Sequence, residues 1–122
     1  MISIDTMVEW IGELSDEIPE VLFKELNGGI SVSEETKISP YARNGDLYIL
    51  AEYHKGRYLG RYIQFFYGSI MRNYGRLSNE ELKKKLRSVL RHELRHHVES
   101  LAGENGLEIE DAKFIRKYLQ TK

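Results

Sequence analysis

Apolar residues recur at helical spacing in the first part of the chain. In residues 5–15 acidic side chains separate the apolar positions, which are Met7, Val8, Ile11 and Leu14. Intervals of three and four residues are typical of an amphipathic helix. Pro19 suits the first turn of a second helix, which we expect to continue to Leu26 and to end at the following Asn27, Gly28 and Gly29.

A longer helix is predicted in the second half of the chain. Ser78 and Glu81 have the spacing of a capping box, and Gly103 and Gly106 are expected to end the helix. Its apolar positions are Leu82, Leu86, Val89, Leu90, Leu94, Val98 and Leu101. A short terminal helix is predicted from Ala112 to Leu119.

The pattern between these helices is that of strands. Residues 30–33 alternate apolar and polar side chains, and a polar segment through Asn44 and Gly45 predicts a loop. Two runs rich in tyrosine, isoleucine and phenylalanine follow, LYILAEY and RYIQFFYGSIM, separated by HKGRYLG. They predict two strands of one sheet. The expected fold is therefore α+β: N-terminal helices, a small mixed sheet, the long helix packed on it, and a short C-terminal helix.

The composition of the chain limits the number of domains, the binding partners and the metal ligands that can be expected. The 122 residues, 41% of them hydrophobic, suffice for a single domain over residues 1–122. A formal charge of -1 gives no general attraction to nucleic acid or to an anionic membrane. With no cysteine, only His, Asp and Glu remain as metal ligands. The first residues contain early acids and no long apolar run, so we expect a cytoplasmic protein without a membrane span.

The long helix contains the pattern HELRH, residues 92–96. Four residues are about one helical turn, so His92 and His96 can share a metal ion with Glu93 beside them. A helical wheel places both histidines at the border of the apolar face and Glu93 further towards it, where burial should raise the pKa of Glu93 and suit it to act as a general base. His97 points to the apolar side and is expected to be structural. Chance could also produce two histidines four apart in RHELRHH.

A zinc site needs a third protein ligand. Glu99 lies on the same edge of the helix as the histidines, but at the limit of its reach. The chain beyond Gly103 is long enough to return to the histidines. The further candidates there are Glu104, Glu108, Glu110 and Asp111.

Two features allow an interpretation as a nucleic-acid binder. The first is the basic run KKKLRSVLR of the long helix, and the second is the set of tyrosines that could stack on bases. Solvated surface and core packing are the commoner roles of such residues.

Four segments of the chain together resemble the small bacterial zincin-like metallopeptidases called minimal zincins. They are ELSDEIPEVLFKELNGGISV, LYILAEYHKG, RYIQFFYGSI and LRSVLRHELRHH, in the same order as in that family. The resemblance implies a minimal zincin-like fold, Zn²⁺ bound by His92 and His96, and Glu93 as general base. The family has a glycine and an aspartate where this chain has Glu99 and Ala102.

The family's later Gly-x-Asp-Asp is similar to GLEIEDAKF in this chain. On this likeness Asp111 is the preferred third ligand, with Glu99 and Glu110 as alternatives. The expected function is hydrolysis of a peptide or protein substrate, which could pair with an edge strand formed by RYIQFFYGSI. Zinc affinity should fall below about pH 6, where histidines are protonated. The alternatives are a zinc-binding protein without hydrolytic activity and a basic-helix nucleic-acid binder.

Overall fold

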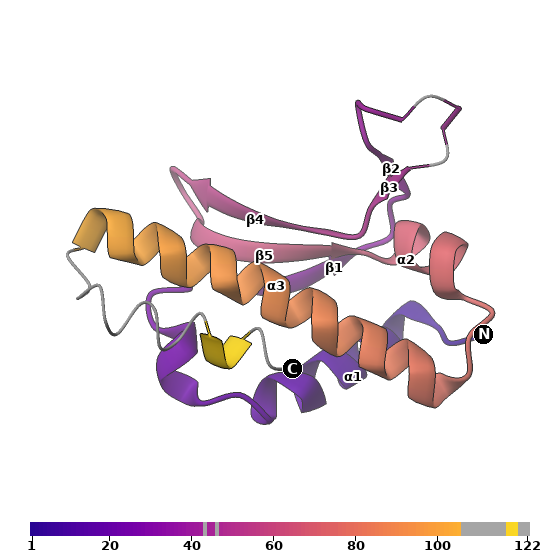
Figure 1. The fold of residues 1–122 in the computed structure, drawn as a ribbon, viewed down its shortest axis with the longest axis horizontal. Helices are drawn as coiled ribbons and strands as arrows, with labels where there is room; N and C mark the ends of the chain where they lie inside the picture. Colours follow the sequence, from indigo (N-terminus) through magenta and orange to yellow (C-terminus); the bar gives the residue numbers. More distant parts are fainter. Residues whose placement is uncertain (43, 46, 106–116, 120–122) are drawn as a thin grey trace.

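The chain forms a layer of helices packed on one face of a three-stranded sheet (Figure 1). The computed structural model describes residues 1–42, 44–45, 47–105 and 117–119, and its description of side chains in the long helix ends at residue 103. The elements are α1 (Ile4–Asp16), the 3-10 helix η1 (Glu20–Phe23), β1 (Gly29–Ser33), β2 (Lys37–Ile38), β3 (Tyr48–Ile49), β4 (Ala51–Gly56), β5 (Gly60–Phe66), α2 (Tyr67–Tyr74) and α3 (Asn79–Asn105). The separation of helices from strands confirms the predicted α+β class.

The central strand of the sheet is β5, which pairs with β1 in parallel and with β4 in antiparallel orientation. The two edges are therefore β1 and β4. The expectation that RYIQFFYGSI forms an edge strand was wrong, because its first part is the middle strand. The connection between the strands is also shorter than predicted: β4 continues through Gly56 and β5 begins at Gly60, whose φ of 73° favours glycine.

A second, two-stranded antiparallel sheet is formed by β2 and β3. It projects from the body of the molecule beside the start of β4 (Figure 1). We call residues 37–49 the arm, of which residues 43 and 46 are outside the described part. Its first strand lies in a segment predicted to be loop.

Helices α1 and α3 contact each other and cover the same face of the sheet. Ile63 and Phe65 of β5 are fully buried beneath them. The buried apolar residues of the two helices repeat at the predicted spacing: Met7, Ile11, Leu14, Leu82, Leu86, Leu90, Leu94 and Val98. The predicted start of the long helix at Ser78 is confirmed, since the Glu81 amide donates to Ser78 Oγ at 3.2 Å.

Two predicted element boundaries were wrong, and a third falls mostly outside the described residues. The segment after Pro19 forms only the 3-10 turn η1, because the backbone becomes extended at Lys24 and Glu25 has a φ of 65°. Helix α3 runs past Gly103 to Asn105; Gly103 is exposed, where its helix penalty is only about 1 kcal/mol. Residues 112–116 of the predicted terminal helix lie outside the described part, and residues 117–119 are helical.

The predicted second strand also ends early, because residues 67–71 belong to α2. Phe66, Ile70 and Tyr74 recur every four residues, which is helical spacing. Gly68 permits the close approach of α2 to the segment before β2, since a Cβ there would lie 2.2 Å from Thr36 Oγ1. No helix in the described ranges has the length and apolar character needed to cross a membrane.

Candidate active site

Helix α3 presents His92 and His96 side by side on its exposed surface. Their Nε2 atoms lie 3.1 Å apart, and the two rings are nearly perpendicular at 87°. The intervening Glu93 points to the buried side and is 7% exposed. The predicted placement of the three side chains on the helix is therefore observed, with the histidines accessible and the carboxyl group shielded from water.

The hydrogen bonds around the pair indicate where each imidazole carries its proton. Arg95 Nη2 lies 3.2 Å from His92 Nδ1 and can only donate, so neutral His92 has its proton on Nε2, facing His96 Nε2. His96 then carries its proton on Nδ1, which lies 4.0 Å from Glu99 Oε1. His96 thus holds the tautomer that leaves Nε2 free for a metal. His92 would have to move its proton to Nδ1, and Arg95 would have to turn away.

The spacing of the two Nε2 atoms fits a shared zinc ion. Two nitrogens bound to zinc at about 2.0–2.1 Å in tetrahedral geometry are roughly 3.3 Å apart, close to the observed 3.1 Å. Burial, followed by the positive charges of His96 and Arg95, lowers the pKa of His92. This favours the neutral form that binds metal.

No third candidate ligand completes this pair in the described part of the chain, where no group of three His, Asp or Glu side chains could hold a metal ion. Glu99 is near Nδ1 of His96, the nitrogen on the other side of the ring from His92. Asp111, Glu110 and Glu108 lie outside the described residues, as does the side chain of Glu104.

A cleft of about 650 Å³ is lined by α3 and by β4, one of the two edge strands of the sheet. Its wall on α3 includes Glu93 and His96. Its wall on the sheet comes from the strand residues 51–55, with Ile49 of the arm at one end. A neighbouring hollow of about 330 Å³ is lined by both His92 and Glu93. Glu93 therefore lies between two hollows, each of which reaches one histidine.

The environment of Glu93 favours its protonated form. Burial, and then the negative charge of Glu52, raise its pKa to about 7. A carboxyl group with a pKa near neutrality is suited to general acid–base catalysis. The increase in the pKa of Glu93 that the sequence predicted is therefore present.

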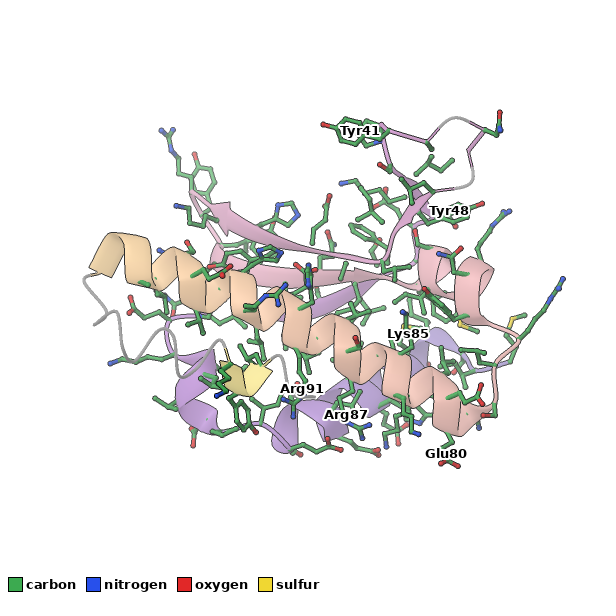
Figure 2. All side chains as sticks on the ribbon, viewed as in Figure 1. Tyr41, Tyr48, Glu80, Lys85, Arg87 and Arg91 are labelled. Atoms are coloured by element: carbon green, nitrogen blue, oxygen red, sulfur yellow. The ribbon has the colours of Figure 1, made fainter. Side chains whose placement is uncertain are left out.

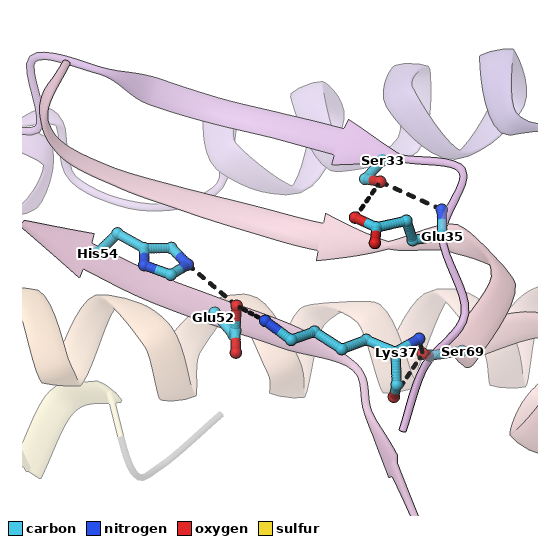
Figure 3. Close-up of polar contacts among 6 residues, drawn as sticks. All are labelled: Ser33, Glu35, Lys37, Glu52, His54 and Ser69. Atoms are coloured by element: carbon cyan, nitrogen blue, oxygen red, sulfur yellow. Dashed lines mark hydrogen bonds and ion pairs between the residues drawn. The ribbon is translucent and has the colours of Figure 1, made fainter. Parts of the chain in front are cut away.

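Glu52 is held on β4 by two hydrogen bonds (Figure 3). Lys37 Nζ and His54 Nε2 donate to its Oε1 at 2.7 and 3.0 Å. Burial raises the pKa of Glu52, but these bonds outweigh it and leave the pKa below its ordinary value. The cleft thus has a fixed negative charge opposite Glu93.

Below the cleft, buried His97 joins three parts of the fold. Its Nε2 donates to the Lys24 carbonyl at 2.8 Å, so its Nδ1 accepts from the Tyr53 hydroxyl at 2.8 Å. Arg61 Nη1 donates to the same hydroxyl at 2.9 Å, and also to Ser100 Oγ. The structural role predicted for His97 is confirmed, and the network ties α3 to β4, to β5 and to the turn after η1.

Sequence reasoning missed the residues of the opposite wall, Glu52, Tyr53 and His54. Their alternation on one strand places Glu52 and His54 on one face and Tyr53 on the other. Which face meets α3 depends on the pairing of β4 with β5, and a local sequence pattern does not contain that information.

The basic residues of α3 do not form one open cationic face. Lys83 Nζ pairs with Glu13, and Arg87 Nε lies 2.9 Å from Glu17 Oε1. Lys85 instead lies over the ring of Tyr74. Figure 2 shows Arg87 and Arg91 on the side of α3 that faces α1, away from Lys85.

A solved structure of a conserved hypothetical protein from T. thermophilus, TTHA0227, is similar to this chain. The two share 32% sequence identity, the TM-score is 0.72, and the match covers 83% of this chain and 98% of that one. No protein-family model matches the chain, and no curated protein matches it.

Proposed function

We propose that this chain, which belongs to the same family as the conserved hypothetical protein TTHA0227, is a zinc-dependent metallopeptidase of the minimal zincin type. One observation carries the proposal. The Nε2 atoms of His92 and His96 lie 3.1 Å apart, next to a buried Glu93, on the wall of a cleft. A hydrolase needs these parts together: a pair of metal ligands, a base of suitable pKa, and room for a substrate.

Three ligands would hold the zinc ion. His92 and His96 supply two, and Asp111 remains our candidate for the third, with Glu110 and Glu99 as alternatives. Asp111 and Glu110 lie outside the described residues, and Tyr118 after them lies beside α3, with its carbonyl 3.4 Å from Arg91 Nη1. Zinc bound there would supply a Lewis acid that activates water and polarises the scissile carbonyl.

Glu93 would act on the protons of the reaction. Its ionised carboxylate would take a proton from the attacking water and deliver it to the leaving amine. Its burial between two hollows excludes bulk water, which strengthens its interaction with charge that develops beside it. Burial, and to a smaller extent the ionised charge of Glu52 across the cleft, raises the basicity of Glu93.

The substrate would lie in extended form along β4. Among the described strands of this sheet β4 pairs with β5 alone and its residues line the cleft, so an extended peptide could add to its other side as a further strand. Such pairing would carry the scissile bond past His96 and Glu93. This favours a peptide substrate over a small ester.

The test compares zinc content and peptide cleavage in four proteins: the wild type, E93Q, H96A and H54A. His54 is the matched control, because it is a histidine of the same cleft outside the proposed ligand pair. We expect one zinc per chain in all but H96A, measured by elemental mass spectrometry. Cleavage of an unstructured peptide library, followed by mass spectrometry, should require both zinc and Glu93.

Two results would contradict the proposal. Absence of zinc from the wild type after purification and reconstitution would remove the metal site. Equal cleavage by the wild type and E93Q would remove Glu93 as the base. D111A separates the third-ligand assignment from the rest, because undiminished zinc affinity in that variant would exclude Asp111 while leaving the reaction intact.

A second candidate is a zinc-binding protein that does not hydrolyse peptides. It is favoured by the exposure of His92 and His96 on α3, which would leave zinc bound by this pair accessible to a ligand from a partner protein. One zinc per wild-type chain without cleavage of any library peptide would select it.

A further inference from the structure

Large apolar side chains are exposed at both ends of β4. Nine such side chains are exposed among the described residues, and five of them belong to the arm or to the turn between β4 and β5. These five are Ile38, Tyr41, Leu47, Tyr58 and Leu59. Exposed apolar groups that gather beside a cleft are typical of interaction sites rather than of random surface.

The arm is continuous with the cleft. Ile49, the last residue of β3, lines the cleft, and Lys37 of β2 is bonded to Glu52 on the cleft wall. Beyond these residues the arm projects from the body, and Tyr41 extends from it into solvent with 86% of its surface exposed (Figure 2). An occupant of the cleft that extends past the start of β4 would therefore meet the arm.

The turn between β4 and β5 lies at the other end. β4 passes through Lys55, which lines the cleft, and ends at Gly56. Tyr58 is 93% exposed and Leu59 is 63% exposed just beyond it. Neither side chain packs in the core, so both could contact a bound molecule that extends beyond the cleft at this end.

We propose that the arm and this turn are docking sites for the two flanks of an extended, unfolded polypeptide segment that carries apolar side chains. This inference rests on the proposed function. The six residues of β4 span about 20 Å at 3.3 Å each, so an occupant that reaches both sites needs roughly ten residues. A folded protein surface does not offer an extended segment of that length with both flanks free. The substrate class is therefore an unfolded chain of about ten residues or more rather than a shorter peptide.

The test measures binding without cleavage in an E93Q background loaded with zinc. The probes are a fluorescein-labelled, unstructured 12-residue peptide with leucine and tyrosine near both ends, and its central six residues. The arm variant carries Y41S and L47S, and the turn variant carries Y58S and L59S. The matched control carries V21S and L77S, which change two exposed apolar residues outside the arm and the turn.

We expect the dissociation constant of the long peptide to rise about tenfold in the arm and turn variants, since each loses two apolar contacts. It should stay unchanged in the control, and the six-residue probe should bind all proteins alike. Equal binding of the long peptide by all variants would overturn the inference. Binding of the six-residue probe in the same experiment would leave the proposed function in place.

Two other outcomes would also overturn it. A wild-type dimer in sedimentation that dissociates in the arm variant would assign the exposed groups to a second copy of the chain. Failure of both probes to bind, together with failure of the wild type to cleave either, would overturn the proposed function and this inference with it.

Discussion

Glu93 is a carboxyl group placed among apolar side chains of α3 and the sheet. Leu90 and Leu94 beside it on the helix are fully buried. Burial is the larger cause of its raised pKa, and the charge of Glu52 is the smaller. The same environment makes the ionised form of Glu93, the proposed base, costly to the folded state.

This cost predicts how the stability of the metal-free protein depends on pH. The pKa of Glu93 is 4.5 unfolded and about 7 folded, so the folded state holds the proton more tightly and loses stability as pH rises from about 4.5 to about 7. At 1.36 kcal/mol per pKa unit the loss is on the order of 3 kcal/mol above pH 7. Urea unfolding of chelator-treated protein between pH 4.5 and 8 should show this loss, and E93Q should lack it. If the free energy of unfolding changed with pH in the same way in the wild type and in E93Q, the loss of stability could not be assigned to Glu93.

At the scale of elements, α3 is held to the sheet by a polar network inside an apolar interface. His97 has a partner on each ring nitrogen, from β4 on one side and from the turn after η1 on the other. Burial lowers the pKa of His97 and keeps the ring neutral, which this arrangement requires. The network fixes the rotation of α3, and with it the direction of His96.

Removal of one hydroxyl should therefore weaken the attachment of α3. Y53F leaves His97 Nδ1 buried without a donor, and we expect a loss of about 1–3 kcal/mol in the free energy of unfolding. Y62F is the matched control on the neighbouring strand, because the ring of Tyr62 stacks on His54 and its loss of a hydroxyl should cost under about 0.5 kcal/mol. If chemical denaturation gave equal losses in the free energy of unfolding for Y53F and Y62F, the hydrogen bond from Tyr53 to His97 would not be an important contribution to stability.

The elements differ in how far the sequence determines them locally. Helices α1 and α3 were predicted because their cores repeat at Met7, Ile11 and Leu14, and at Leu86, Leu90 and Leu94. The change from β5 to α2 was not predicted, because an apolar run such as FFYGSI is compatible with a strand or with a helix. In the folded chain its helical part packs through Gly68 against Thr36. The side of the cleft on α3 followed from helical spacing alone. The side on β4 did not, because it depends on contacts between strands.

At the scale of the whole molecule, zinc binding at the proposed site would be coupled to the stability of the fold, because the proposed histidine ligands lie on the packed helix α3. A zinc ion that binds only the folded chain adds to its stability by mass action. We expect about 2.7 kcal/mol of added stability at a zinc concentration one hundred times the dissociation constant. Thermal unfolding with zinc and with chelator should show the difference in the wild type, and H92A should show none. An equal zinc effect in H92A would place the metal elsewhere.

The order of the elements along the chain determines when this site can exist during synthesis. All three strands of the sheet and the Lys24 turn are made before α3, which carries His92, Glu93 and His96. A chain translated only as far as β5 carries the β4 side of the cleft but neither the proposed histidine ligands nor the proposed base. Zinc bound at the proposed site would therefore be taken up late in synthesis, once α3 has been made.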